Sequence, residues 1–124
     1  MRVAIVGSRY RPEQKEAYRT AVFEYILALD DKTVIVSGGC PNSPDALAEE
    51  FAFSLLKPDP DIYPVRDVDV KKHGSFGKAA FARNQDIVAN CDRLVAFWNG
   101  TSRRTKNSID IALKSRRDIE VYFL

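Results

Sequence analysis

Short apolar runs alternate along the chain with longer stretches in which apolar residues recur every three or four positions. The short runs, rich in β-branched residues, predict buried strands, and the longer stretches predict helices with one apolar face. Strands are expected over 3–6, 33–36, 61–65, 93–98 and 119–124, and helices over 12–29, 44–57, 76–90 and 104–115. The polar segment from Arg66 to Ser75 is expected to be a loop.

Five strands alternating with four helices predict an α/β fold, a Rossmann-like three-layer sandwich with about five parallel strands and helices on both faces. A length of 124 residues fits one domain, so residues 1–124 are expected to form a single ligand-binding domain. In such sheets ligands bind outside the carboxyl ends of the strands, where the winding direction reverses. This rule selects the loops after the first, second and fourth strands.

These three loops carry glycines, and two of them run directly into a helix. Glycine lets the backbone approach a ligand, and the free N–H groups of a helix N-terminus favour an anion. A single glycine pair after a strand is commonly only a tight turn, but three such loops at one edge predict a phosphate-binding pocket. The loop residues expected to contact the ligand are Gly7, Ser8, Arg9, Ser37, Gly38, Gly39, Asp45, Gly100, Thr101, Ser102, Arg103 and Thr105.

Basic side chains stand at the start of the last predicted helix, where each cation costs about 0.3–1 kcal/mol unless water screens it. A bound phosphate would reverse the sign of this effect, which favours a functional role for the cations. Arg103 is expected to point inward, rather than Arg104 or Lys106.

The third predicted helix places Arg83 and Asn84 on its inward face. A buried charge needs a partner, and two are open: a carboxylate such as Asp45, or the phosphate or ribose of a ligand. We favour ligand contact, because inward polar side chains stay partly solvated at a strand-end pocket. The rest of the inward stripe consists of Phe76, Ala79, Ala80, Ile87 and Cys91.

Composition bears on whether the chain binds polyanions, binds metals, is secreted or inserts into a membrane. The net charge of +2 is too small to imply a polyanion-binding surface by itself. Cys40 and Cys91 lack the spacing of a zinc site, so reduced thiols, no metal and no cofactor are expected. The N-terminal apolar run is too short for a signal peptide, and no segment approaches the ~20 apolar residues of a membrane span. A cytoplasmic protein with no membrane partner is therefore expected.

Four motifs occur in a recognisable order: VAIVGSR, VSGGCPNSPDALAEEFA, ARNQDIV and LVAFWNGTSRRTKNSID. In order and spacing they resemble the SLOG superfamily, the Rossmann-like group of the Smf/DNA-processing protein A and Lonely Guy phosphoribohydrolase folds, and in particular its small single-domain members. The resemblance covers nearly the whole chain, and Asp45 matches the acid of the small-member pattern. It implies phosphate or ribose contacts for Gly38, Gly39, Arg83, Gly100, Ser102 and Thr105.

Two departures from that pattern bear on chemistry. Arg104 replaces the second glycine of the last motif, and Asn107 and Ser108 stand where Lonely Guy enzymes carry a catalytic acid. The resemblance therefore implies binding more directly than hydrolysis.

The main functional expectation is a binding module or sensor for a phosphate-bearing nucleotide or nucleotide derivative. One alternative is cleavage or transfer at the N-glycosidic bond of a nucleoside monophosphate, as in Lonely Guy enzymes or nucleoside deoxyribosyltransferases, with Asp45 or Asp110 as catalytic candidates. A second alternative is nucleic-acid binding, which the resemblance to Smf proteins implies. Pairing of two copies is a further expectation, with candidate interface residues Tyr10, Tyr18, Phe53 and Phe81.

Overall fold

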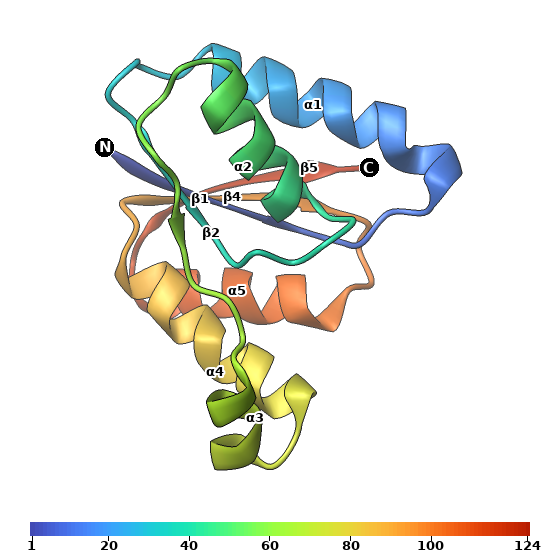
Figure 1. The fold of residues 1–124 in the computed structure, drawn as a ribbon, viewed down its shortest axis with the longest axis vertical. Helices are drawn as coiled ribbons and strands as arrows, with labels where there is room; N and C mark the ends of the chain where they lie inside the picture. Colours follow the sequence, from blue (N-terminus) through green and yellow to red (C-terminus); the bar gives the residue numbers. More distant parts are fainter.

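A computed structural model describes all 124 residues and contains one five-stranded parallel sheet (Figure 1). The strand order is β3-β2-β1-β4-β5, so the chain winds outward from β1 to β3 and then crosses to β4 on the other side of β1. This arrangement confirms the predicted α/β class, and it puts the reversal of winding between β1 and β4. The strands are β1 (Arg2–Gly7), β2 (Val34–Ser37), β3 (Asp61–Ile62), β4 (Arg93–Trp98) and β5 (Asp118–Phe123).

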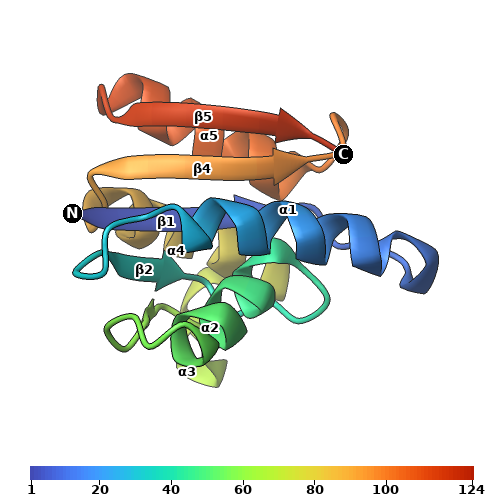
Figure 2. The ribbon, with the colours of Figure 1, turned by 90° about the horizontal axis from the view of Figure 1, so that it is seen from above.

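Helices cover both faces of the sheet, as predicted (Figure 2). The helices α1 and α2 pack on one face, α4 and α5 pack on the other, and α3 protrudes beyond the sheet against α4 (Figure 1). None of these helices is long and apolar enough to cross a membrane. The helices are the short 3-10 turn η1 (Pro12–Gln14), α1 (Lys15–Leu27), α2 (Pro44–Ser54), α3 (Asp67–His73), α4 (Phe76–Ala89) and α5 (Arg103–Lys114).

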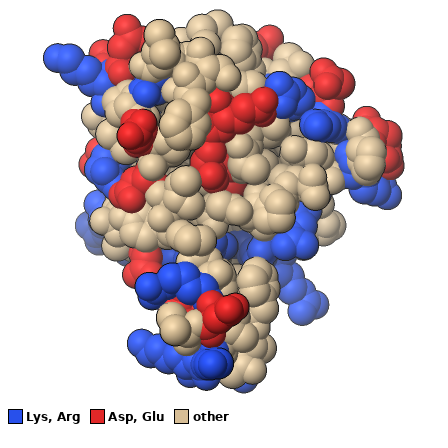
Figure 3. Space-filling model, in the orientation of Figure 1, with Lys and Arg blue, Asp and Glu red and all other residues tan.

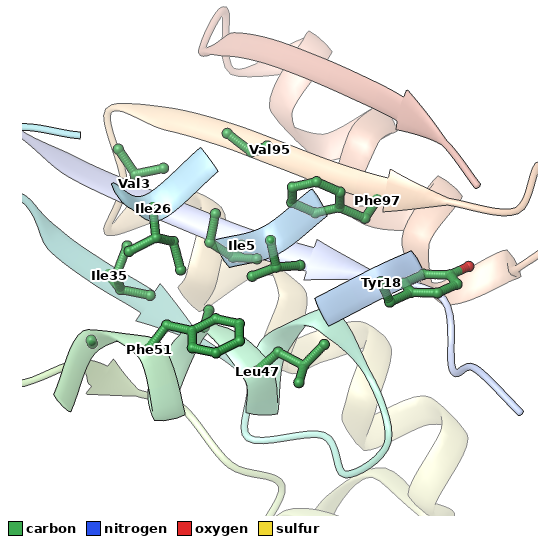
Figure 4. Close-up of a cluster of buried hydrophobic side chains, with 12 residues drawn as sticks. Val3, Ile5, Tyr18, Ile26, Ile35, Leu47, Phe51, Val95 and Phe97 are labelled. Carbon is green, nitrogen blue, oxygen red and sulfur yellow. The ribbon is translucent and has the colours of Figure 1, made fainter. Parts of the chain in front are cut away.

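Alternation along β1 divides the core into two layers. Val3 and Ile5 point toward α1 and α2, where Tyr18 and Phe51 complete the packing (Figure 4). Ala4 and Val6 point toward α4 and α5. Both layers are buried because successive side chains of a strand leave opposite faces of the sheet. Tyr18 is only 2% exposed, so its predicted role in an interface between copies is wrong.

The segment from Arg66 to Ser75 is the main error in the predicted elements, because it contains α3 rather than a loop. The Asp69 carboxylate accepts a hydrogen bond from the Arg66 backbone N–H at 2.9 Å, and Gly74 ends the helix at φ 89°. Acidic residues in its first turn and basic residues in its last turn interact favourably with the helix dipole. Strand β3 is also shorter than predicted, since Pro64 has no backbone N–H to continue the ladder.

Candidate functional site

The loops after β1, β2 and β4 meet at the carboxyl edge of the sheet. The Ser8 hydroxyl accepts a hydrogen bond from the Asn99 N–H at 2.9 Å, which ties the first loop to the third. The Tyr10 N–H donates to the Asn42 carbonyl at 2.9 Å, which ties the first loop to the second. The predicted convergence is therefore present, but Ser8 is buried and already used within the protein.

Two of the predicted ligand-contact glycines have structural reasons for being glycine. A Cβ at Gly7 would collide with the Phe97 carbonyl and the Pro44 ring. A Cβ at Gly38 would lie 2.7 Å from the Arg83 guanidinium. Gly39 and Gly100 are exposed, and both have the positive φ that L side chains rarely adopt.

The Arg83 guanidinium lies against the backbone of Gly38. Its Nη1 donates to the Gly38 carbonyl at 2.6 Å and to the Tyr63 carbonyl at 3.1 Å, while its buried Nε has no partner. Burial lowers the pKa of Arg83, and the charge of nearby Asp45 opposes that shift. Arg83 therefore joins the loop after β2 to the loop after β3 through neutral carbonyls and forms no direct ion pair.

Asp45 also contacts Gly38 and is 5% exposed. One carboxylate oxygen accepts from the Gly38 N–H and the other from the Ser43 hydroxyl, both at 3.1 Å. Burial raises the pKa of Asp45 to about 6, although the charge of Arg83 and these hydrogen bonds act in the opposite direction. The carboxylate thus links Gly38, in the loop after β2, to Ser43, which precedes α2.

Asn84 connects α4 to the first turn of α5. Its amide nitrogen donates to the Arg104 carbonyl at 3.3 Å and to the Asn107 side chain at 3.1 Å. At 3% exposure the side chain is enclosed. The inward orientation predicted from the helical stripe is present, but the amide is satisfied within the protein. Phe76, predicted for the same stripe, is instead 50% exposed, because it begins α4 beyond the cover of the sheet.

The N-terminus of α5 is also capped from within. The Ser102 hydroxyl accepts a hydrogen bond from the Thr105 N–H. The Asn99 side chain accepts hydrogen bonds from the N–H groups of Thr101 and Ser102, both at 2.9 Å. Thr105 is buried and bonded to the Ser102 hydroxyl. The N–H groups of Thr101, Ser102 and Thr105, which were expected to face a phosphate, therefore already have acceptors within the protein.

Arg104, and not Arg103, points toward the neighbouring loop. Its guanidinium donates to the Cys40 sulfur at 3.1 Å, whereas Arg103 is exposed. Ser108 and Ile111 are buried on the inward side of α5. Arg104 precedes Ser108 by four residues and therefore lies on the same face of the helix. This periodicity could have identified Arg104 from the sequence. Ser37, another predicted contact, is buried and donates to the Glu49 carboxylate.

The two catalytic candidates lie apart. Asp110 forms an ion pair with Lys106 at 2.9 Å on α5, where both side chains are about half exposed. Asp45 is enclosed beneath the loop after β2 and lines a cavity that Asp110 does not reach.

The cavity beneath the three loops is small, with a volume of about 20 Å³. Arg83, Asn84 and Arg104 are among the residues that line it. A single water molecule needs roughly 10–15 Å³, so the cavity holds little more than one.

Two larger grooves lie beside this small cavity. The first, called here the rim groove, has a volume of about 190 Å³ and is lined by Arg9, Arg83 and Arg104 together with Phe76. Gly38, Gly39, Cys40, Pro41, Pro64 and Val65 complete its lining, and none of its lining residues is a carboxylate. The second, the α3–α4 groove, has a volume of about 570 Å³ and lies between the end of β3, α3 and α4.

Sequence comparison finds no matching family model and no matching curated protein. Structure comparison finds DNA processing protein A from Helicobacter pylori, with its single-stranded DNA binding mode, at a TM-score of 0.68 and 21% identity over 98% of this chain. It also finds DNA processing protein A from Streptococcus pneumoniae, at a TM-score of 0.75 and 21% identity over 97% of this chain. The chain spans 64% and 49% of the lengths of these two structures.

These similarities correct the main functional expectation. A sensor for a small nucleotide-derived ligand is the wrong prediction, because the Helicobacter pylori protein that shares the fold binds single-stranded DNA. The cavity beneath the three loops, at about 20 Å³, is also too small for a nucleotide. The chain has the Rossmann-like fold of DNA processing protein A, as its resemblance to the SLOG superfamily implied.

Proposed function

We propose that this chain binds single-stranded nucleic acid along the rim groove. The observation that carries the proposal is the lining of that groove, which combines the three arginines Arg9, Arg83 and Arg104 with no carboxylate. Phosphates of the nucleic-acid backbone dominate such binding, and they require an excess of cations on the surface that follows the strand. A net charge of only +2 is sufficient when the cations are gathered in one groove.

The rim groove also offers a surface for a base. Phe76 is 50% exposed at its wall and lies outside both core clusters. Bases of a single strand stack on aromatic side chains, at about 1–3 kcal/mol per base, because their faces are not covered by a complementary strand. A ring beside three guanidinium groups supports a single strand as the ligand rather than a duplex.

The glycine turns support the same ligand in a different way from the one predicted. Gly39 is exposed in the groove and has no side chain, so a strand can approach the backbone closely there. The arginines supply the positive charge. The DNA-binding description of the Helicobacter pylori protein adds support, because its similarity extends over 98% of this chain.

Fluorescence anisotropy of a labelled oligothymidylate tests the proposal. We expect binding that weakens with salt at a logarithmic slope of about −0.7 per phosphate contact, with weak competition by duplex DNA and by thymidine monophosphate. Arg9→Ala should weaken binding about tenfold, the effect of losing one charged hydrogen bond.

Arg11→Ala is the matched control, because Arg11 is exposed two residues away and pairs with Glu13 at 3.0 Å instead of lining the groove. Absence of oligonucleotide binding, or equal competition by the mononucleotide, would contradict the proposal. Circular dichroism of each variant separates lost binding from lost folding.

A further inference from the structure

The rim groove does not end at Arg83. The α3–α4 groove begins at the same place, since both grooves are lined by Arg83 and Pro64. The Tyr63 carbonyl that accepts from Arg83 belongs to the segment leading into α3, so one side chain fixes the junction of the two grooves. Any strand that follows the rim past Arg83 therefore meets the larger groove next.

The α3–α4 groove has room for a nucleotide-sized group. Its volume of about 570 Å³ falls within the roughly 300–1,000 Å³ of pockets that hold small ligands. Tyr63 lines it with a ring that is half buried and held by a hydrogen bond from its hydroxyl to Asp61 at 2.8 Å. His73 adds a second ring from α3. Rings held in place are suitable surfaces for an unpaired base.

Besides Arg83 and His73, two cations and two carboxylates line this groove. Arg66 pairs with Asp69 at 3.2 Å and lowers the pKa of that carboxyl. Lys72 from α3 and Asp86 from α4 also line the groove, and neither forms an ion pair. In the space-filling view, the protruding part that carries α3 shows Lys and Arg side chains together with Asp and Glu side chains (Figure 3).

We propose that a bound single strand continues from the rim groove past Arg83 into the α3–α4 groove, where Tyr63 contacts a base and Lys72 a phosphate. This inference rests on the proposed function and extends it to the length of strand that the protein recognises. Two adjoining grooves bind a longer strand more tightly than a short one that fills only the rim. The mixed charge of the second groove makes its contribution smaller than that of the three rim arginines.

A length series of oligothymidylates, from four to twenty nucleotides, tests this path by anisotropy. The wild type should bind more tightly as length increases and then reach a plateau. Lys72→Glu should weaken binding of the longest strand about tenfold, reduce its salt slope by at least about 0.7, and leave the shortest bound strand unchanged. Lys72→Gln should show a smaller loss with the same dependence on length, which guards against fraying of α3 by the introduced acid.

Lys32→Glu is the matched control, because this exposed lysine precedes β2 at the opposite edge of the sheet and should not alter binding at any length. Equal loss at all lengths for the Lys72 variants, or no loss at any length, would overturn the inference while the rim proposal stands. If the wild type binds no oligonucleotide at all, the proposed function itself fails.

Discussion

The Arg83 guanidinium and the backbone of Gly38 are in direct contact at the carboxyl edge of the sheet. Nη1 donates to the Gly38 carbonyl at 2.6 Å, and a Cβ on residue 38 would lie 2.7 Å from the same nitrogen. The Asp45 carboxylate accepts from the Gly38 N–H, and one of its oxygens would lie 3.0 Å from the same Cβ. The backbone of a single glycine thus contacts both a cation and a buried carboxylate.

Gly38→Ala should destabilise the protein by about 1–3 kcal/mol, because the new methyl group must displace Arg83 or Asp45. Urea denaturation measures this change. Gly77→Ala is the control, since no atom lies within 4 Å of its Cβ position in α4 and alanine favours a helix. Equal stability of Gly38→Ala and the wild type would show that the contact is not restrictive.

The buried Asp45 predicts a specific dependence of stability on pH. Its pKa rises from an ordinary 3.8 to about 6 on folding, so the folded state retains this proton to a higher pH than the unfolded state. The contribution to stability is therefore complete below pH ~4 and falls by up to about 3 kcal/mol as the pH rises to and beyond 6. Asp45→Asn removes this titration.

Urea denaturation of wild type and Asp45→Asn at pH 4.5 and pH 7.5 measures the effect. The asparagine variant should gain stability relative to wild type as the pH rises. Asp59→Asn, an exposed loop substitution, controls for the loss of one negative charge. A constant difference between wild type and Asp45→Asn across this range would contradict the prediction.

Asn84→Ala should cost about 1–3 kcal/mol of unfolding free energy, since it removes a buried amide that joins α4 to the Arg104 carbonyl and to Asn107. Asn90→Ala, at the exposed end of the same helix, should change stability less. Thermal unfolding compares the two variants, and similar losses would place the importance of Asn84 in doubt.

Arg104→Ala should weaken binding of an oligothymidylate about tenfold at low salt, because its guanidinium lines the rim groove. Arg103→Ala should have a smaller effect, since the preceding residue is exposed and lies outside the groove lining. Anisotropy titrations at two salt concentrations distinguish these outcomes. The reverse order of effects would indicate that the strand follows another surface.

The alternation of apolar runs was enough to predict five parallel strands, two helical layers and the edge at which the loops converge. These features follow from periodicity, because a side chain's position in a strand or helix determines which face it occupies. The inward position of Asn84 was predictable in the same way. Helix α3 was missed because its only apolar residues, Val68 and Val70, are two positions apart and do not form a helical stripe. Its stability depends on end charges and on packing against α4.

Only the tertiary structure decided what the polar residues at that edge do. The sequence indicates that Ser8, Asn84 and Ser102 lie near the strand ends, but not whether their partners are ligands or other parts of the chain. Those partners come from segments as many as 91 residues away, as in the hydrogen bond between Ser8 and Asn99. Several hydrogen-bonding groups at the edge bond one another once the loops meet, so only a small cavity remains beneath the loops and the arginines line the rim groove beside it.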